Sequence, residues 1–516
     1  MKVFLGSAPW SFANVAPRHL IDSSGWIGRL AGIGRRQVKG PSPAFGLLYL
    51  ASMLRSKGHE IVLAEGGDHT LPMMLELIER ERPDLIGIGL TTPLWPATQR
   101  FAREIKDRFD VPIVIGGPFP TTWRQRCLDE CDAVDYVVVG EGELITLDLI
   151  EALEHRMGFA QVDGLAWRHE GRSVMNKPAK VPQDLDALPF PARDLVDLPR
   201  YVPSLVRFKR LPTTQFFSTR GCPFQCNFCW VNPVFRKRSI PNIMEELREI
   251  HDRYGVHDFT LFDDDTTLDK NHTLAIAEGI LSAGLDFSWN INARVDGGYT
   301  VDHYKTLRRA GVWRVLFGIE SGVQKNLDGM WKRTKLESIR EGVRTCRKGG
   351  VAPYGTFIFG APGETYEDGL ATIDFATSLG LEYASFSVLT PFPGTAFFNQ
   401  IGQERMFDWS RFTGDGPCYQ TDAMTQHQLE SLLKLAYRRF YFRPSYILKR
   451  GLRSLTSMEE MRKNIAAWEG LRKIDTRTIE EAQVQSLYAA PERMGAVGCG
   501  TVAPDAVPAR AREAAS

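Results

Sequence analysis

The feature that most constrains the fold is a repeated alternation of short apolar strands with amphipathic helical segments. In residues 1–185, apolar runs rich in β-branched residues are separated by segments such as 45–58, which ends at Gly58, a residue suited to a helix C-terminus. This alternation is typical of a parallel sheet covered by helices, and it predicts an α/β, doubly wound, Rossmann-like domain over 1–185. The predicted strands are 2–6, 59–65, 85–91, 111–117 and 133–140.

A second alternation follows a stretch punctuated by prolines. Residues 186–212 belong to this stretch, which cannot hold a continuous helix and is interpreted as a linker. Six strand–helix units over 213–398 predict a (β/α)6-type partial barrel, whose functional groups should gather after the carboxyl ends of its strands. Residues 399–485 are predicted to be mainly helical, and the Ala-, Pro- and Gly-rich tail 486–516 to be disordered.

The charge balance argues against several classes of partner. The 516 residues carry a net charge of +1, which gives no bulk electrostatic reason to bind nucleic acid or a membrane surface. No apolar run approaches the ~18 residues of a membrane-spanning helix, so no stable membrane insertion is expected. The first residues lack the apolar core and cleavage site of a signal peptide, which predicts a cytoplasmic protein.

Eight cysteines are too few for a disulfide scaffold in a chain of this length. Cys127 and Cys131 lie four residues apart on one helical face, and a core or surface pair is favoured over a metal site. Cys346 continues an apolar helical stripe and is expected in the core. Cys418 and Cys499 stand alone in the sequence, and no role is assigned to them.

The remaining three cysteines are the strongest chemical signal. Cys222, Cys226 and Cys229 form a CxxxCxxC motif directly after the first strand of the predicted barrel. Structural zinc sites normally have four protein ligands, so three thiolates imply either zinc completed by a distant histidine or a metal with an open position. Cysteine thiolates also hold four-iron clusters, and three of them would leave one iron available to another ligand.

The motif is followed by FTLFDDDTT, NARVD, RVLFGIESG, FIFGAPGET and PFPGT at the ends of later strands. In this order and spacing, the chain resembles the radical S-adenosylmethionine (SAM) enzymes, in particular the branch with a cobalamin-binding front domain. The resemblance implies a [4Fe-4S] cluster held by the three cysteines, with SAM chelating the fourth iron through its amino and carboxylate groups. One electron from the cluster then cleaves SAM to methionine and a 5′-deoxyadenosyl radical.

The resemblance also implies a SAM-binding role for residues at the strand ends. A phenylalanine would pack on adenine, an aspartate would hold the amino nitrogen, and an arginine fork suits the carboxylate. A glutamate suits the ribose hydroxyls, and a glycine lets backbone approach the ligand. For each residue, the alternative is a structural ion pair or a turn. For the three adjacent aspartates, a magnesium site or a solvated turn is a further alternative. Which of the three aspartates would contact SAM stays open. The residues are Phe228, Asp263, Asp264, Asp265, Asn292, Arg294, Glu320 and Gly360.

The front domain resembles the cobalamin-binding domains that are fused to radical SAM barrels. Glycines at its strand ends would let bare backbone lie against a large flat cofactor, and threonines could bond the nucleotide tail. A domain for a nucleotide or a protein partner is the alternative, although GxGxxG is absent. The motif DxHxxG is absent too, so a bound cobalt should lack that lower histidine ligand. The implied residues are Gly89, Thr91, Thr92, Gly116, Gly117, Gly140, Glu141 and Gly142.

The favoured hypothesis is a cobalamin-dependent radical SAM C-methyltransferase. The resemblance implies that the deoxyadenosyl radical abstracts hydrogen from an unactivated carbon, which then takes a methyl group from methylcobalamin. A non-methylating enzyme with the same cofactors, catalysing oxidative cyclisation or a ring rearrangement, is the first alternative. A zinc-stabilised binding module is the second. Methylthiolation of tRNA is disfavoured, because the front domain lacks a strand-end cysteine trio and the C-terminal region is helical.

The expected partners are a small-molecule substrate and a low-potential electron donor such as flavodoxin or ferredoxin. The Ala/Arg/Pro-rich tail is associated with GC-rich genomes, in which many relatives tailor secondary metabolites. Trp230, Phe392 and the loop 20–43 are expected where a substrate pocket closes. The basic-aromatic segment 437–455 could contact a lipid or phosphorylated substrate, but a solvated helix packed on the barrel is favoured.

Overall fold

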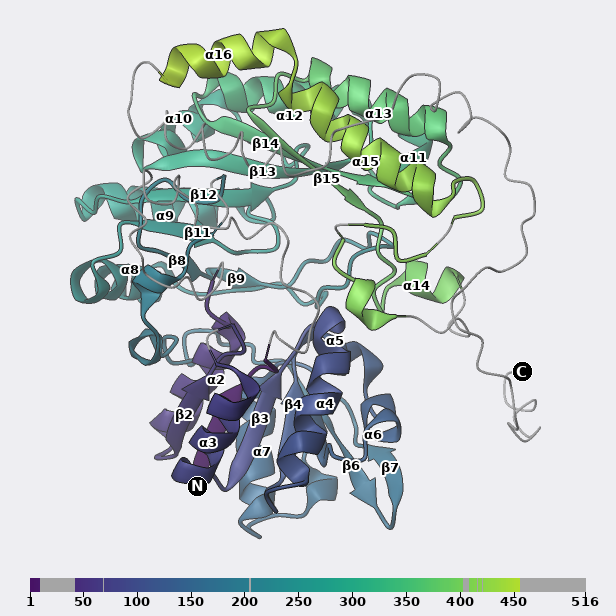
Figure 1. The fold of residues 1–516 in the computed structure, drawn as a ribbon. Helices are drawn as coiled ribbons and strands as arrows, with labels where there is room; N and C mark the ends of the chain where they lie inside the picture. Colours follow the sequence, from purple (N-terminus) through teal and green to yellow (C-terminus); the bar gives the residue numbers. More distant parts are fainter. Residues whose placement is uncertain are drawn as a thin grey trace. The chain divides into compact units, whose positions relative to one another are not determined.

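The structure, a computed structural model, describes residues 1–9, 42–67, 69–203, 206–401, 408–414, 416–419 and 421–454. Several sequence-based predictions lie outside the described residues. They concern residues 20–41 of the predicted loop 20–43, residues 455–485, the tail 486–516 and Cys499. The described residues belong to one compact unit, whose chain path is drawn in Figure 1.

The front domain is built on a seven-stranded sheet with the order β2-β1-β3-β4-β5-β6-β7. The five predicted strands are all present and parallel, whereas β6 and β7 run antiparallel. Strand order reverses between β1 and β3, and doubly wound sheets bind ligands beyond the carboxyl ends of the strands at such a point. The strands are β1 (Lys2–Gly6), β2 (Glu60–Ala64), β3 (Leu85–Gly89), β4 (Ile113–Gly116), β5 (Tyr136–Val138), β6 (Leu165–His169) and β7 (Arg172–Met175).

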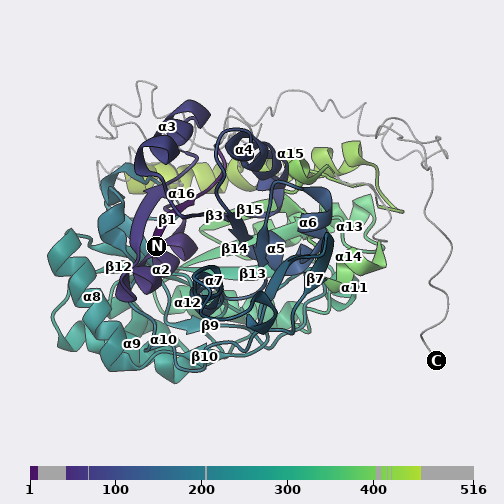
Figure 2. The ribbon, with the colours of Figure 1, turned by 90° about the horizontal axis from the view of Figure 1, so that it is seen from below.

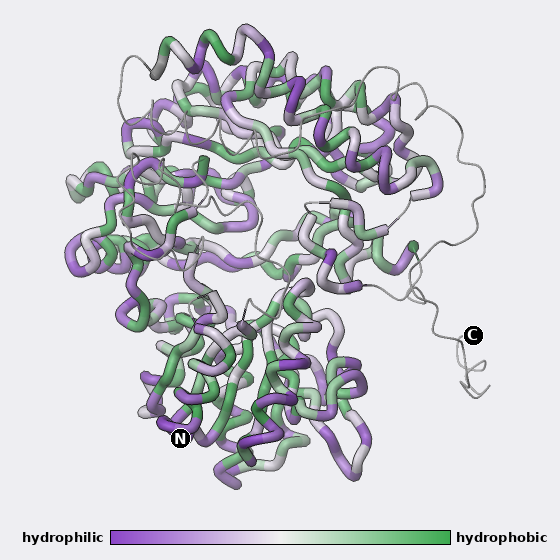
Figure 3. Tube along the Cα trace, in the orientation of Figure 1, coloured by the Kyte–Doolittle hydropathy of each residue, from purple (hydrophilic) through white to green (hydrophobic). Residues whose placement is uncertain are grey.

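Helices cover both faces of this sheet, as the alternation predicts. Helices α2 and α7 share one apolar core around Leu54, and α3 to α6 share another around Phe101. In Figure 3, β3 and β4 are coloured as hydrophobic, as expected for strands covered on both faces. Cys127 and Cys131 are buried in the second core, which confirms a core pair. The helices are α2 (Phe45–Ser56), α3 (Leu71–Glu81), η2 (Thr92–Leu94), α4 (Trp95–Lys106), α5 (Pro118–Trp123), α6 (Arg126–Glu130), α7 (Gly142–Leu153) and η3 (Phe159–Gln161).

The hairpin of β6 and β7 lies outside the predicted strands. Its turn has φ angles of 49° at Glu170 and 77° at Gly171. Two successive residues with positive φ are what a type I′ turn requires, and this turn suits a tight hairpin. The sequence signal that could have found it is the Glu-Gly pair between the two short runs of AWRHEGRSVM.

The linker between the two sheets is fastened to the barrel. Among its described residues, which leave out 204–205, the helical turns are η4 (Arg193–Leu195) and η5 (Leu198–Arg200). The buried guanidinium of Arg193 lies 2.7 Å from Glu246 and donates to the carbonyl oxygen of Gln215 at 3.0 Å. Arg238 binds the same glutamate at 2.5 Å. Buried charges are stable only with partners of this kind, so the linker is held in a defined place.

Six parallel strands form the second sheet in the order β15-β14-β13-β12-β11-β8. Because each strand pairs with the next one along the chain, leaving two edges, the sheet is an open barrel of the predicted (β/α)6 type. Figure 2 shows α8, α9 and α10 following one another along its outer side. Cys346 is buried in α12, as expected. The elements are β8 (Thr213–Phe216), α8 (Ile240–Tyr254), β11 (Asp258–Leu261), α9 (Lys270–Ser282), β12 (Ser288–Ala293), α10 (Val301–Arg309), β13 (Val312–Glu320), α11 (Gln324–Gly329), α12 (Leu336–Lys348), β14 (Ala352–Phe359), α13 (Tyr366–Ser378) and β15 (Tyr383–Val388).

A C-terminal helix covers the free edge of β15. The hydroxyl of Tyr441 donates to the carbonyl oxygen of Ala384 at 2.6 Å and accepts from its N–H at 3.0 Å. Tyr437 makes the same pair of bonds with Phe386, at 3.2 and 3.3 Å. The two hydroxyls replace a neighbouring strand and satisfy backbone groups that an open edge would expose. The elements of this region are α14 (Ala396–Gln400), η6 (Trp409–Arg411), α15 (Gln426–Tyr441) and α16 (Pro444–Ser454).

These helices agree with the favoured interpretation of the segment 437–455, up to its last described residue, Ser454. None of the described helices is long and apolar enough to cross a bilayer.

Candidate active site

The three cysteines lie on one loop, residues 221–235, which we call the cysteine loop. It connects β9 (Thr219–Arg220) to β10 (Arg236–Lys237), two short strands that pair with each other. At Gly221 the φ angle is 95°, and a Cβ would lie 2.1 Å from the carbonyl oxygen of Val234, so only glycine fits. The N–H of Cys222 donates to the carbonyl oxygen of Asn232 at 2.9 Å, which closes the loop on itself.

Asn227 anchors the middle of the cysteine loop to the barrel. Its side-chain amide donates to the carbonyl oxygen of Gly329 at 2.8 Å, and its own carbonyl oxygen accepts from the N–H of Phe397 at 2.8 Å. The side chain of the next residue, Phe228, packs against the apolar cluster that contains Phe397. The backbone between Cys226 and Phe228 is therefore fixed before any ligand binds.

The three thiols are free of disulfide partners. Desolvation raises the pKa of Cys229 to about 12, and the nearby charges of Cys226, Asp264 and Cys222 add to the increase. A metal would therefore have to displace the protons of these thiols as it binds. In the part of the chain that the structure describes, no three His, Cys, Asp or Glu side chains are gathered closely enough to hold a metal ion as they stand.

The donor set nevertheless fits an iron–sulfur cluster, since thiolates are the protein ligands of such clusters and these thiols have no competing covalent partner.

The three aspartates at the end of β11 have different surroundings. Asp263 is buried and accepts from the N–H and hydroxyl of Ser218, and burial raises the pKa of Asp263 to about 6. Asp265 is buried as well and accepts from the N–H of Arg294 at 3.2 Å. Asp264 is exposed, and one of its oxygens accepts from the N–H of Gly221 at 3.0 Å. Asp264 is thus the one exposed side chain of the three, while Asp265 keeps one buried oxygen, Oδ2, without a hydrogen-bond partner among the described residues. The neighbouring Asn292 is half-buried and donates to the carbonyl oxygen of Asp263 at 3.2 Å.

Arg294 and Glu320 already have partners within the barrel. The guanidinium of Arg294 binds Asp296 through two nitrogens at 3.0 Å each and lies 4.2 Å from the ring of Phe224 in the cysteine loop. The carboxylate of Glu320 accepts from Nζ of Lys332 at 2.9 Å. Contacts of Arg294 with the SAM carboxylate and of Glu320 with its ribose stay predictions, and each would have to be shared with the present partner.

Gly360 follows β14 in a conformation that favours glycine, with φ of 91°. Its N–H donates to the carboxylate of Glu364 at 2.5 Å, and the N–H of Ala361 donates to the same oxygen at 2.9 Å. The carbonyl oxygen of Gly360 accepts from the hydroxyl of Tyr419 at 2.8 Å. The turn that was predicted to approach SAM is thus held from both sides by buried groups.

The residues predicted to bind cobalamin lie along one edge of the first sheet. Gly89 and Gly116 end neighbouring strands and are paired with each other. Gly117 and Gly140 have φ of 111° and 122°, and a Cβ at Gly117 would lie 2.6 Å from the carbonyl oxygen of Leu90. Since parallel strands bring their carboxyl ends to one edge, the predicted set is brought together. Its other members are Thr91, which is exposed, Thr92, which is buried, and Glu141 and Gly142 at the start of α7.

The side chain of Glu141 is engaged with the barrel. Its carboxylate binds Arg236 and Arg220, the two residues that flank the cysteine loop, at 2.5 to 3.0 Å. Burial opposes ionisation of this carboxyl group, but the two arginines hold the pKa of Glu141 below its usual value. A contact of Glu141 with cobalamin stays a prediction, and the structure gives the side chain another partner.

A second contact between the front domain and the cysteine loop forms around Gly394. A Cβ at this residue would lie 2.7 Å from Cγ2 of Thr122 and 2.9 Å from Cδ1 of Trp230. Trp230 directly follows the last cysteine and is 42% exposed. Phe392 packs against Phe412 instead. Of the residues expected at a substrate pocket, Trp230 therefore lies where the cysteine loop, the front domain and the barrel end meet.

Sequence reasoning misses several residues that hold this site together. Glu364 lies inside the quoted segment FIFGAPGET, four residues after Gly360, so the sequence could have indicated that its carboxylate holds this turn. Asn227 lies inside the cysteine motif but has no characteristic spacing of its own. Lys332 belongs to no motif, and only the fold brings it to Glu320.

Comparison with known families agrees with the division of the chain into a front domain and a barrel. The radical SAM superfamily matches residues 216–376, a range that contains all three cysteines. The B12 binding domain family matches residues 33–150, which contain the glycine-rich ends of β3, β4 and β5.

Individual relatives cover most of the chain. An uncharacterized methyltransferase of Pyrococcus horikoshii is 33% identical over 425 residues, which are 80% of this chain and 91% of the relative. The anaerobic magnesium-protoporphyrin IX monomethyl ester cyclase of Rubrivivax gelatinosus is 27% identical over 431 residues, 80% of this chain and 76% of that protein.

Among solved structures, the radical S-adenosylmethionine methyltransferase TsrM of Kitasatospora setae, with cobalamin and a [4Fe-4S] cluster bound, superposes with a TM-score of 0.65. The identity is 18%, and the superposition covers 93% of this chain and 100% of that one. At this identity the likeness establishes a shared fold.

Proposed function

Because the chain belongs to the radical SAM superfamily and contains a B12-binding domain, we propose that it is a cobalamin-dependent methyltransferase acting on an unactivated carbon of a small molecule. The observation that carries this proposal is the trio of free cysteines after the first barrel strand. The two arginines that flank their loop bind Glu141 of the front domain, whose strand ends carry glycines suited to close approach by a flat cofactor. The methyltransferase of Pyrococcus horikoshii supports the same assignment.

The residues divide between the cofactors. Cys222, Cys226 and Cys229 would hold a [4Fe-4S] cluster, and the strand ends from Gly89 to Gly142 would hold cobalamin. When bound, the cluster supplies the electron that cleaves SAM, and cobalamin carries the methyl group. The protein's own contribution is to hold the reacting groups and to keep water away from the radical.

We assign the SAM amino group to Asp264, because its side chain is exposed where those of the adjacent aspartates are buried. One of its oxygens binds the N–H of Gly221, so this carboxylate would connect SAM to the start of the cysteine loop. Phe228 offers an aromatic face to the adenine, and Gly360 offers backbone without a side chain. Trp230, beside Gly394 at the end of the barrel, would form one wall of the substrate site.

The reaction needs a low-potential electron donor, for which a flavodoxin or ferredoxin is the proposed partner. We place the protein in the cytoplasm, because free thiols and clustered metal-binding cysteines are stable in a reducing compartment. A secondary metabolite is the proposed class of substrate.

A non-methylating reaction is the second candidate function, and one observation favours it. The cyclase of Rubrivivax gelatinosus aligns with as large a share of this chain, 80%, as the methyltransferase of Pyrococcus horikoshii does, although at lower identity. The motifs report cofactors and not the fate of the radical, so a labelled methyl group must decide between the two reactions.

The test is anaerobic reconstitution with iron, sulfide and cobalamin, followed by incubation with methyl-labelled SAM, a reductant and candidate substrates. Mass spectrometry should find the label in a product, together with 5′-deoxyadenosine and S-adenosylhomocysteine in near-equal amounts. A substrate-dependent yield of 5′-deoxyadenosine without S-adenosylhomocysteine would favour the non-methylating reaction. Zinc in place of iron and sulfide after anaerobic purification would instead indicate a zinc-stabilised binding module.

A further inference from the structure

The hairpin that carries the cysteine loop has two like charges at its base. Strands β9 and β10 pair over two residues each, and Arg220 lies directly opposite Arg236 in this ladder. A pair of strands this short is marginal by itself. Like charges directly opposite each other weaken such a ladder further. The hairpin therefore needs an outside group to hold its base closed.

The front domain supplies that group as Glu141. Its Oε1 lies 2.5 Å from Nη2 of Arg236, and its Oε2 lies 3.0 Å from Nη1 of the same residue. The Oε2 atom also accepts from Nη1 of Arg220 at 2.9 Å, so one carboxylate bridges both arginines. Glu143, two residues further on in the first turn of α7, accepts from Nη2 of Arg220 at 2.7 Å. Two carboxylates thus neutralise two guanidinium groups, and bidentate pairing is the strongest geometry for it.

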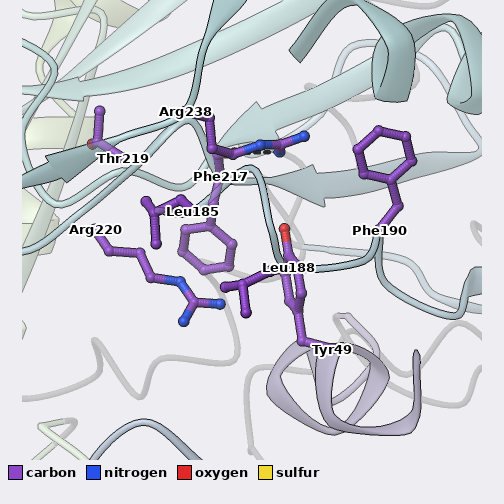
Figure 4. A pocket seen from close by; sticks show the side chains of 8 residues that line it. All are labelled: Tyr49, Leu185, Leu188, Phe190, Phe217, Thr219, Arg220 and Arg238. Atoms are coloured by element: carbon purple, nitrogen blue, oxygen red, sulfur yellow. Dashed lines mark hydrogen bonds between the residues drawn. The ribbon is translucent and has the colours of Figure 1, made fainter. Parts of the chain in front are cut away.

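The surroundings shield this ion-pair cluster from water. The side chain of Arg236 is 3% exposed and that of Arg220 is 18% exposed. Figure 4 shows Arg220 beside a small pocket lined by apolar groups, among them Leu188 and Phe217. The guanidinium of Arg220 also lies 5.2 Å from the ring of Tyr49. Ion pairs in such a setting are screened little by salt, so the contact is stronger than a surface pair of equal length.

Glu141 lies between Gly140 and Gly142, at the carboxyl end of β5, where cobalamin is proposed to bind. We infer that Glu141 is a positioning residue that couples the two cofactor sites by holding the base of the cysteine loop. The inference rests on the proposed function, because it assumes a cluster on the cysteines and cobalamin on the front domain. Coupling between binding sites is reciprocal in affinity, so bound cobalamin should tighten cluster binding and a bound cluster should tighten cobalamin binding. We expect the tighter cluster binding to appear as slower iron loss.

The test compares the full-length variants Glu141→Gln and Lys237→Gln with the wild-type protein. Lys237 is the matched control. It lies next to Arg236 in β10, but it pairs at 2.9 Å with Asp269, a residue of the barrel and not of the front domain. The first readout is hydrogen exchange of peptides covering residues 221–235 in the cofactor-free proteins. The second is the rate of iron release to a chelator after reconstitution, measured with and without cobalamin.

In the wild-type protein and in Lys237→Gln, we expect cobalamin to slow iron release about fivefold, a typical size for coupling between sites. In Glu141→Gln, the loop should exchange faster without cofactors, and the effect of cobalamin on iron release should disappear. Glu143→Gln should lie between these limits, because Glu143 binds only Arg220. Directly after reconstitution, Glu141→Gln should contain as much iron as the wild-type protein. An equal iron content would show that this variant folds.

Three outcomes would contradict the proposals, and they can be told apart. If the wild-type protein takes up iron, sulfide and cobalamin but Glu141→Gln shows unchanged loop exchange and the same cobalamin effect, the coupling inference is wrong. If the wild-type protein takes up neither a cluster nor cobalamin, the proposed function itself fails. Loss of the cobalamin effect in Lys237→Gln as well would also contradict a specific role of Glu141.

Discussion

The ammonium group of Lys332 lies 2.9 Å from the carboxylate of Glu320, and both side chains are at most 10% exposed. Glu320 ends β13 with φ of 68°, a left-handed conformation that is unfavourable for a glutamate. Burial alone would lower the pKa of Lys332, but Glu320 and Cys226 raise it above its usual value, so the lysine stays charged. The pair therefore fixes the carboxylate of a residue with strained backbone at the end of a barrel strand, and Cys226 of the cysteine loop is close enough to affect the charge of Lys332.

Replacing Lys332 with Met should destabilise the cofactor-free protein. The substitution leaves the buried carboxylate of Glu320 without its counter-charge, and we expect the free energy of unfolding to fall by about 3 kcal/mol. Urea unfolding measures this change. The control is Lys325→Met, since Lys325 pairs with Asp368 at 2.7 Å but is 57% exposed. That change should cost less than about 1 kcal/mol. Equal losses in the two variants would contradict the role given to burial.

Tyr441→Phe should weaken the open edge of the barrel. The substitution removes one hydroxyl that bonds both backbone groups of Ala384, a buried residue. We expect a loss of about 2 kcal/mol and faster hydrogen exchange of the Ala384 amide. Tyr254→Phe is the control, because the hydroxyl of Tyr254 makes no hydrogen bond among the described residues. An unchanged exchange rate at Ala384 would show that α15 does not hold the edge.

Glu364 should make stability depend on pH. Burial raises the pKa of Glu364 from its ordinary value of 4.5 to about 7, although the N–H groups of Ala361 and Gly360 oppose the shift. The folded protein then binds this proton more tightly than the unfolded chain does. The stability that Glu364 gains from this difference in proton binding is fully present below pH 4.5 and is lost as the pH rises to about 7.

The measurement is urea unfolding of the wild-type protein and of Glu364→Gln at about pH 5 and about pH 8. Relative to the variant, the wild-type protein should lose about 2 kcal/mol between these values. The variant keeps an oxygen that can accept from the two N–H groups, so its fold is retained. A difference between the two proteins that does not change with pH would contradict a raised pKa at Glu364.

Local patterns in the sequence predict the strands and the cysteine loop but not the partners of the charged residues. The strand-helix alternation is a local property, and each of the eleven predicted strands has its counterpart among β1–β5 and in the barrel sheet. Glu141 and Arg236 are 95 residues apart, and their pairing follows only from how the front domain meets the barrel. Arg294 and Glu320 likewise look free in the sequence. Asp296 lies in the quoted segment NARVD, but nothing there marks it as the partner of Arg294, and Lys332, the partner of Glu320, belongs to no quoted segment.

Cobalamin bound to this protein should have no histidine below the cobalt. The described histidines of the front domain are at positions 59, 69, 155 and 169, and none lies at the carboxyl end of β3, β4 or β5. We also expect the cofactor's own benzimidazole tail to lie off the metal. Paramagnetic resonance of the bound cobalt(II) form should then lack the three-line nitrogen splitting of an axial base, and such a splitting would contradict this prediction.

The central claim is that Cys222, Cys226 and Cys229 hold a cluster that cleaves SAM. The most direct test is the formation of 5′-deoxyadenosine by anaerobically reconstituted protein, with SAM and dithionite and without any substrate. The wild-type protein should form it and should show the visible absorption of an iron–sulfur cluster. Alanine at any one of the three cysteines should abolish both, whereas Cys346→Ala should lower neither. A triple-alanine protein that still forms 5′-deoxyadenosine would contradict the claim.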